Sequence, residues 1–155
     1  VTALADIDPV KRTGDISSVV GNIGGGDNSQ ALDLSGVAIY ETGLELIADS
    51  SVDVVDICVP TLYHADLVCA ALAAGKHVFC EKPITINYKL SCEMKEEADK
   101  RGLMLNIGVC NRHNVSVEKL KDMYDNGEFG KVYHVNCSFR SCRNIPGIGG
   151  SFTTK

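Results

Sequence analysis

The stretch VDVVDICVPTLYHADLVCAALAAGKHVFCEKPIT, residues 52–85, decides the fold expected for this chain. It contains an apolar run over residues 52–60, a helical pattern over residues 64–74 and a second apolar run over residues 77–80. Glycine follows the helical pattern at position 75, where helices commonly end. A strand, a helix and a strand in this order predict a β-α-β unit with parallel strands.

The same alternation continues on both sides of this unit. Short apolar runs predict strands over residues 37–40 and 103–109, and helical patterns cover residues 42–49 and 88–101. The chain also opens on VTALADIDP, which reads as a strand running into acidic residues. Strands that alternate with helices favour a parallel sheet with helices on both faces.

Other parts of the chain follow different patterns. Residues 20–36 are rich in Gly, Asn, Asp and Ser and predict a long surface loop. Beyond Arg112 we expect a helix over residues 117–126 and a strand over residues 131–140. The alternation in that last strand predicts one solvated face, which is typical of an antiparallel sheet.

Composition excludes several functional classes. The chain has 155 residues, of which 45% are hydrophobic and 23% charged, with a net charge of -5, so it predicts a globular domain rather than a nucleic-acid-binding one. No run is long enough to span a bilayer, and no partner membrane is expected. The seven cysteines include no C-x-x-C pair, which favours core thiols in a reducing cytoplasm. The histidines lack metal-ligand spacing, so no metal site is predicted.

Polar residues collect where the predicted strands end. In open parallel sheets, ligands bind outside the carboxyl ends of the strands. The residues at these ends, in chain order, are Asp6, Asp8, Pro60, Thr61, His64, Glu81, Lys82, Asn111 and Arg112.

Three of these side chains suggest a specific chemistry. An acid such as Asp6 can accept hydrogen bonds from both hydroxyls of an adenosine ribose and would repel a 2′-phosphate, which favours NAD over NADP. Lys82 could exchange a proton with a substrate oxygen if burial lowered its pKa, and Glu81 could orient it. Pro83 removes an N–H and turns the chain, and a cis Lys82–Pro83 bond is a hypothesis.

Each of these positions also has an ordinary structural explanation. Asp6 and Asp8 could be turn or cap acids, and His64 could be an exposed residue in the first turn of a helix. Lys82 could be a surface lysine. The charged run EMKEEADKR, residues 93–101, is expected to be a solvated helix face.

The ordered motifs of the chain resemble the Gfo/Idh/MocA oxidoreductases, whose hallmark is Glu-Lys-Pro at the end of a strand. The motifs that carry the resemblance are ADID, PTLYH, AGKHVFCEKP, NIGVCNR and GEFGKV. The resemblance implies an incomplete Rossmann-type parallel sheet over residues 1–112, followed over residues 113–155 by the beginning of an α+β domain with an open sheet.

The resemblance also implies an activity and roles for the residues at the strand ends. The expected reaction is hydride transfer between NAD, or alternatively NADP, and a hydroxyl or carbonyl carbon of a sugar, cyclitol or related polyol. Self-association into a homo-oligomer is expected for the full-length protein. By resemblance, Lys82 is the catalytic lysine; Asp6, Pro60, Thr61, His64, Glu81, Lys82 and Pro83 lie at the cofactor; and Asn111 and Arg112 face the substrate or nicotinamide.

The chain departs from the family pattern in two ways. The Gly-rich phosphate loop after the first strand is absent, and neither GNIGGG at residues 21–26 nor PGIGGS at residues 146–151 opens a predicted helix. The D-x-x-x-H segment that completes proton transfer in the family is also absent. We therefore expect an internal piece of a longer oxidoreductase, without turnover on its own.

Two other functional classes fit parts of the sequence. LADIDPV matches the D-x-D-x-V pattern of magnesium-dependent phosphatases of the haloacid dehalogenase type, in which Asp6 would be the nucleophile and Asp8 the acid or base. A non-catalytic dinucleotide sensor or dimerisation module would use the same fold, because a fold does not determine a function.

Overall fold

The computed structural model describes residues 1–18 and 31–138. The chain forms two compact units, one of Val1–Gly14 and Leu32–Cys110, the other of Asp15–Ala31 and Asn111–Lys155. Each unit is described below by itself. Most of the predicted loop over residues 20–36, together with the sequences GNIGGG and PGIGGS, lies outside the described residues.

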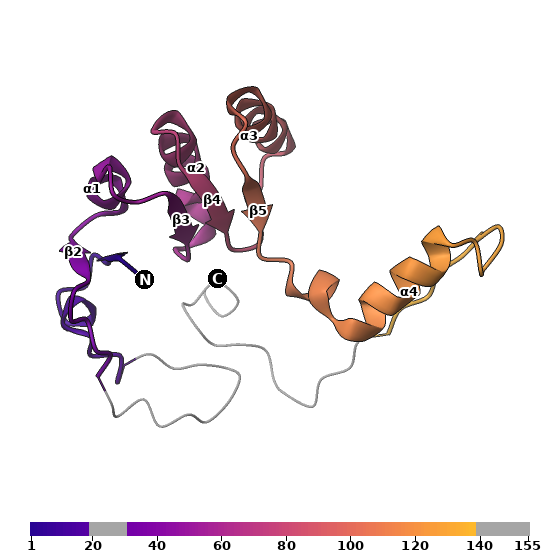
Figure 1. The fold of residues 1–155 in the computed structure, drawn as a ribbon, viewed down its shortest axis with the longest axis horizontal. Helices are drawn as coiled ribbons and strands as arrows, with labels where there is room; N and C mark the ends of the chain where they lie inside the picture. Colours follow the sequence, from indigo (N-terminus) through magenta and orange to yellow (C-terminus); the bar gives the residue numbers. More distant parts are fainter. Residues whose placement is uncertain (19–30, 139–155) are drawn as a thin grey trace, which may run out of the picture. The chain divides into compact units, whose positions relative to one another are not determined.

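The first unit contains two parallel sheets, as Figure 1 shows. One is a pair formed by β1 (Ala3–Ala5) and β2 (Ala38–Tyr40), and the other is a triplet in the order β3 (Val54–Ile57), β4 (His77–Cys80) and β5 (Leu105–Ile107). Every strand pair in both sheets is parallel. The predicted α/β class with parallel strands is therefore confirmed.

Local sequence explains where the helices of this unit begin and end. They are α1 (Gly43–Ala48), α2 (His64–Ala73) and α3 (Tyr88–Arg101). Thr42 and Glu45 form a capping box at the start of α1, in which each side chain accepts a hydrogen bond from the backbone N–H of the other residue. Asn87 caps the start of α3, and Gly102 ends it with a φ of 65°, which glycine adopts without steric cost.

The core lies between the β3-β4-β5 sheet and the helices α2 and α3. Strand residues on the face that packs against these helices are buried. They form one hydrophobic cluster with residues of α2 and α3. The fully buried side chains with the largest volume include Leu72 and Val68 of α2, Met94 of α3 and Cys80 of β4. This packing holds the carboxyl ends of the three strands in a defined arrangement.

Helices cover one face of this sheet within the described residues, rather than both faces as predicted. Residues of β3 alternate between exposed and buried, so that Val54 is 55% exposed while Val55 is 6% exposed. Asp56 is also exposed. Within the apolar run over residues 52–60, the strand itself therefore spans only four residues, and these alternate in burial.

The prediction that the cysteines are core residues holds for Cys80 and is wrong for most others in the described part of the chain. Cys58, Cys69, Cys110 and Cys137 are exposed, because their positions fall on the solvent side of their segments. The hydrophobicity of the neighbouring residues did not distinguish these two sides.

The C-terminal segment of the second unit begins within η3 (Cys110–His113), a short 3-10 helix, and continues into α4 (Val115–Asp125). Helix α4 starts two residues before the predicted range, because the Asn114 side chain accepts a hydrogen bond from the Ser116 N–H. The predicted strand over residues 131–140 is wrong as far as the structure describes it, since residues 131–138 form no ladder. A strand needs a partner for its backbone groups, which the described residues do not provide.

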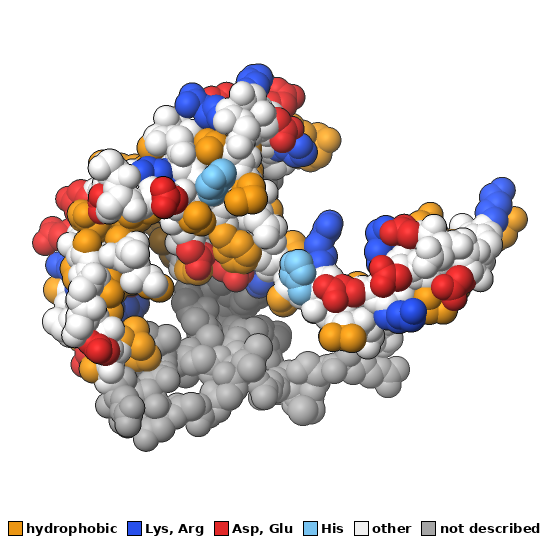
Figure 2. Space-filling view, in the orientation of Figure 1, with side chains coloured by type: hydrophobic (Ala, Val, Ile, Leu, Met, Phe, Trp, Pro, Cys, Tyr) orange, Lys and Arg blue, Asp and Glu red, His pale blue; other side chains and the backbone are white. Residues whose placement is uncertain are grey.

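The surface of α3 carries charges of both signs. Acidic and basic side chains stand next to one another over this helix in Figure 2, and the pairs Lys89–Glu93, Lys95–Asp99 and Arg101–Glu97 are each four residues apart. The prediction that residues 93–101 include a solvated charged face is confirmed. None of the helices in the described part of the chain is long and apolar enough to cross a lipid bilayer.

Candidate functional site at the carboxyl ends of the strands

The carboxyl ends of β3, β4 and β5 lie side by side. The ladder pairs Ile57 with Cys80 and Cys80 with Ile107, so the three strands end at the same level. The Glu81 N–H donates to the Ile57 carbonyl at 3.0 Å, and the Gly108 N–H donates to the Cys80 carbonyl at 2.8 Å. The residues that follow these strands are therefore neighbours, as the sequence predicted for an edge that binds ligands.

Glu81 is held between its own backbone and β5. Its Oε2 atom accepts a hydrogen bond from the Lys82 N–H at 3.1 Å. The carboxylate lies against Gly108, where an added Cβ would stand 3.0 Å from Oε1. The peptide bond from Lys82 to Pro83 is cis, as hypothesised from the sequence.

Lys82 is exposed at this edge. The described residues of this unit leave its side chain open to solvent. A proton-transfer role for Lys82 requires that other groups, such as bound cofactor and substrate, exclude water from it.

His64 is buried, with 1% of its surface exposed, so it is not the exposed first-turn residue that the sequence left as one possibility. Its Nδ1 lies 2.8 Å from the Pro83 carbonyl oxygen and its Nε2 lies 2.7 Å from the Val59 carbonyl oxygen. Neither ring nitrogen is free for a cofactor in this arrangement. The cofactor contact expected of His64 stays a prediction.

Pro60 and Thr61 form the turn between β3 and α2. Pro60 precedes η2 (Thr61–Tyr63), a 3-10 helix that continues directly into α2, and its carbonyl accepts a hydrogen bond from the Tyr63 N–H. Thr61 is half-buried. The turn therefore places both residues at the carboxyl end of β3, beside the turn that carries Lys82.

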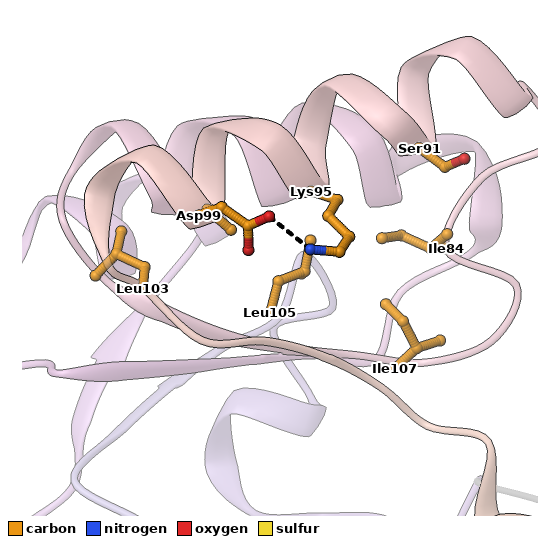
Figure 3. A pocket seen from close by; sticks show the side chains of 8 residues that line it. Ile84, Ser91, Lys95, Asp99, Leu103, Leu105 and Ile107 are labelled. Atoms are coloured by element: carbon orange, nitrogen blue, oxygen red, sulfur yellow. Dashed lines mark hydrogen bonds and ion pairs between the residues drawn. The ribbon is translucent and has the colours of Figure 1, made fainter.

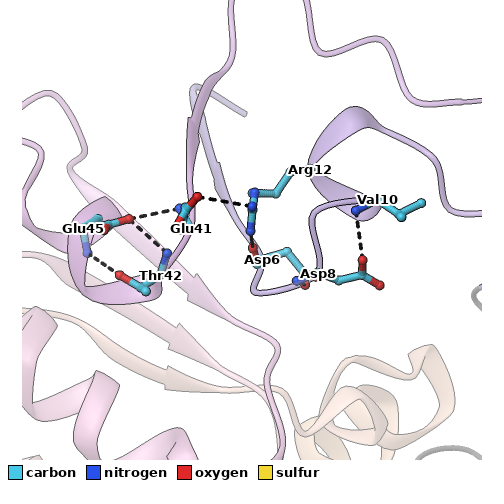
Figure 4. A network of polar contacts seen from close by, with 7 residues as sticks. All are labelled: Asp6, Asp8, Val10, Arg12, Glu41, Thr42 and Glu45. Carbon is cyan, nitrogen blue, oxygen red and sulfur yellow. Dashed lines mark hydrogen bonds and ion pairs between the residues drawn. The ribbon is translucent and has the colours of Figure 1, made fainter.

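At the other sheet, Asp6 follows β1 and belongs to a polar network shown in Figure 4. Its Oδ1 accepts a hydrogen bond from the Asp8 N–H at 2.8 Å, while Oδ2 lies 4.0 Å from the Lys11 Nζ. The Arg12 guanidinium, in η1 (Lys11–Thr13), donates to the Asp6 backbone carbonyl at 2.8 Å and to Glu41 Oε1 at 3.4 Å. Asp6 thus keeps one carboxylate oxygen without a hydrogen bond in this network.

Asp8 has a local role, as the cap interpretation predicted. Its Oδ1 accepts a hydrogen bond from the Val10 N–H at 2.9 Å, which closes the turn before η1. Within residues 1–18 and 31–138, no group of three or more His, Cys, Asp or Glu side chains could hold a metal ion. The magnesium cluster that the phosphatase interpretation requires is therefore not formed by these residues.

Two cysteines lie close to the strand ends, and neither is a nucleophile at neutral pH. Desolvation raises the pKa of Cys58 to about 11, helped by a hydrogen bond to Asp56 and by the charges of Asp56 and Glu81. Desolvation also raises the pKa of Cys80 to about 11, with contributions from Cys58 and Glu81. Both side chains remain thiols, so covalent thiolate chemistry at this edge is disfavoured.

A groove of about 230 Å³ lies between α3 and β5. Figure 3 shows Leu103, Leu105 and Ile107 on its apolar side and the Lys95–Asp99 ion pair on α3. None of its lining residues is among the predicted site residues. The groove therefore shares no lining residue with the predicted site around Lys82, and we assign no ligand to it.

Asn111 and Arg112 lie in η3, within the second unit, and both are exposed. Their predicted contact with substrate or nicotinamide stays a prediction. The predicted domain boundary after Arg112 likewise stays a prediction.

Two features of the site were missed from the sequence. Gly108 was treated as an ordinary strand residue, although glycine at the end of a strand can indicate a close approach by another group. The bond between Arg12 and Glu41 joins residues 29 positions apart, and no local pattern indicates it.

The fold and the strand-end residues define a dinucleotide-binding α/β oxidoreductase domain, and comparison with known proteins agrees. The family described as "Oxidoreductase family, NAD-binding Rossmann fold" (GFO_IDH_MocA) matches residues 7–109. The chain belongs to the Gfo/Idh/MocA oxidoreductase family. This assignment confirms the resemblance and the nicotinamide-dinucleotide class of cofactor, and it replaces the phosphatase interpretation.

Two curated relatives illustrate the match. A myo-inositol 2-dehydrogenase from Thermotoga maritima is 39% identical over 101 residues, which cover 65% of this chain and 30% of that protein. An inositol 2-dehydrogenase from Rhodococcus jostii is 32% identical over 126 residues, which cover 81% of this chain and 34% of that protein. The chain thus spans about a third of the length of these relatives.

A solved structure shows the same fold. The NAD-binding oxidoreductase from Klebsiella pneumoniae superposes with a TM-score of 0.64 at 30% sequence identity, covering 83% of this chain and 30% of that one. The similarity supports the Rossmann-type fold.

Proposed function

We propose that the full-length protein is a nicotinamide-dependent dehydrogenase that oxidises a ring hydroxyl of a cyclitol, with Lys82 exchanging the proton on the substrate oxygen. The polyol class is supported by the two inositol dehydrogenases that the chain resembles. The proposal concerns the whole protein, of which this chain carries the strand-end residues.

The observation that carries the proposal is the position of Lys82. It follows β4, the central strand of the triplet, and Glu81 accepts a hydrogen bond from its backbone N–H. Gly108 leaves room for the Glu81 carboxylate, so an acid lies beside the backbone of a lysine at the edge where parallel sheets bind ligands. An alcohol that is being oxidised must lose its hydroxyl proton, and a lysine at this edge can accept it.

The residues present fit a dinucleotide. Asp6 keeps one carboxylate oxygen without a hydrogen bond in its network and could bond the ribose hydroxyls, while the turn at Pro60 and Thr61 would face the cofactor beside Lys82 and Pro83. When bound, the nicotinamide supplies the acceptor for the hydrogen removed from the substrate carbon. We infer a preference for NAD, because Asp6 would repel a 2′-phosphate and Arg12 is already engaged by the Asp6 carbonyl and Glu41.

The test is the variant Lys82→Met in the natural full-length protein. With inositols as substrates, the turnover number should fall by about 10²- to 10⁴-fold, while the dissociation constant for NAD changes little, because proton transfer contributes in this range to the chemical step. Lys100→Met is the matched control, since Lys100 is an exposed lysine of α3 outside the site.

Two outcomes would contradict the proposal. If Lys82→Met oxidised inositols as fast as Lys100→Met, Lys82 would not act in the chemical step. If the full-length protein bound NAD but oxidised none of the cyclitols and sugars tested, the dinucleotide-sensor interpretation would gain support instead.

A further inference from the structure

The His64 ring joins two turns at the carboxyl ends of β3 and β4. One bonded carbonyl belongs to Val59, directly before Pro60 and Thr61, and the other belongs to Pro83, directly after Lys82. The ring is 1% exposed at the first residue of α2, so α2 packing and these two contacts determine its orientation. A single side chain thus connects the predicted cofactor turn with the turn that carries Lys82.

The chemistry of the two contacts determines how the ring can bind. A carbonyl oxygen only accepts hydrogen bonds, whereas a neutral imidazole carries a single N–H donor. The two ring nitrogens lie 2.8 and 2.7 Å from the two carbonyl oxygens, so whichever nitrogen carries the proton donates to one of the two turns.

The charged groups on the elements packed around the ring are of both signs. They are Asp66 on α2, Asp56 on β3, and Glu81 and Lys82 after β4. Neither ring nitrogen bonds to any of these side chains, so the two carbonyls are the direct partners of the ring. In the described part of the chain, every buried side-chain nitrogen and oxygen has a hydrogen-bond partner, and the His64 ring meets this condition through these carbonyls.

We propose that His64 is a positioning residue, whose buried ring lies between the Val59 and Pro83 carbonyls and thereby places Lys82 for proton transfer. The inference rests on the proposed function of Lys82. It assigns His64 no contact with the cofactor, in contrast to the role that the family resemblance implied.

The first test is spectroscopic and needs no variant. In the proton NMR spectrum of the full-length protein, the His64 ring should give a slowly exchanging N–H signal, because its proton is buried and bonded to a carbonyl oxygen. ¹⁵N labelling of histidine assigns it. A His64 ring N–H that exchanges rapidly with water would overturn the arrangement, whatever the activity of the protein.

The second test is kinetic. His64→Gln keeps a polar side chain but cannot span both carbonyls, so the turnover number should fall by about 10- to 100-fold through misplacement of Lys82, with the dissociation constant for NAD unchanged within about twofold. His134→Gln is the control, because His134 is exposed and lies outside the site. An equal loss of NAD affinity would instead identify His64 as a cofactor-binding residue and overturn the inference.

The two proposals fail in different ways. If Lys82→Met abolishes turnover but His64→Gln does not, the positioning role is wrong and the proposed function stands. If neither variant affects turnover, the proposed function is wrong. Should His64→Gln not fold, the NMR measurement on the unmodified protein still decides whether the ring N–H is buried and bonded between the two turns.

Discussion

The Glu81 carboxylate occupies the space that a side chain at Gly108 would need. A Cβ added at Gly108 would stand 3.0 Å from Glu81 Oε1 and 3.3 Å from Oε2. The two residues come from neighbouring strands, since Gly108 follows β5 and Glu81 follows β4. Glycine at position 108 therefore allows the acid to lie beside the backbone of Lys82.

We predict that Gly108→Ala lowers turnover of the full-length protein by about tenfold, because the Glu81 carboxylate must move away from the Lys82 N–H. The backbone at Gly108 is not in the left-handed region, so alanine should fold normally. Steady-state kinetics and thermal unfolding of the same sample measure both effects. Gly43→Ala is the control, because an added Cβ there meets the end of the flexible Leu67 side chain; equal rates for the two variants would contradict the prediction.

Cofactor preference should depend on Asp6. Asp6→Ser keeps a side-chain oxygen for the turn but removes the negative charge, so the affinity for NADP should rise relative to NAD by at least about tenfold. Fluorescence titration with both dinucleotides measures the ratio. Asp8→Ser is the matched control in the same turn, because Asp8 bonds the Val10 N–H. The prediction fails if both variants leave the ratio as it was.

Lys76 should contribute to stability rather than to catalysis. It is 8% exposed, and its ammonium group donates to the Asp49 carbonyl at 2.8 Å and to the Val52 carbonyl at 2.5 Å, which joins the end of α1 to the start of β3. Lys76→Met keeps most of the apolar stem but leaves both carbonyls without this donor, so the free energy of unfolding should fall by about 2 kcal/mol. Urea unfolding measures the change. Lys100→Met, at an exposed position, should change it by less than about 0.5 kcal/mol.

The pKa of Asp49 should respond to its hydrogen bonds. Bonds from the Ser51 N–H, the Ser51 hydroxyl and the Tyr40 hydroxyl lower this pKa, with the Ser51 N–H contributing most. Tyr40→Phe removes one donor, so the pKa of Asp49 should rise towards its usual range. Carboxyl ¹³C NMR during an acid titration measures it, with Tyr133→Phe, at an exposed position, as the control. An unchanged pKa in Tyr40→Phe would contradict the assignment.

The sign of the corresponding pH effect on stability follows from the lowered pKa. The native state holds Asp49 ionised at pH values where the unfolded chain would begin to take up a proton. The stabilising contribution is therefore complete above the ordinary aspartate pKa of about 3.9 and is lost as the pH falls through the lower native value. In Tyr40→Phe, the free energy of unfolding should therefore fall less as the pH is lowered into the acid range. Its dependence on pH near neutrality should be unchanged.

Local sequence determined the order of helices and strands in the first unit. The helix predicted over residues 88–101 is observed with the same bounds, and the strand predicted over residues 77–80 is also observed as such. These elements depend on hydrogen bonds within a few residues, on caps such as Asn87 and on a terminating glycine such as Gly102. The position of Lys82 at a strand end was predictable for the same reason.

Only the tertiary structure decided which groups meet at the site. The Pro83 carbonyl lies 19 residues from His64 in sequence, and Gly108 and Glu81 come together through the pairing of two strands. The expected strand over residues 131–140 shows the same limit, because a strand pattern forms a ladder only when another segment supplies partners. Helices satisfy their backbone groups locally, whereas strand pairing and side-chain contacts depend on residues distant in the chain, and no short pattern records them.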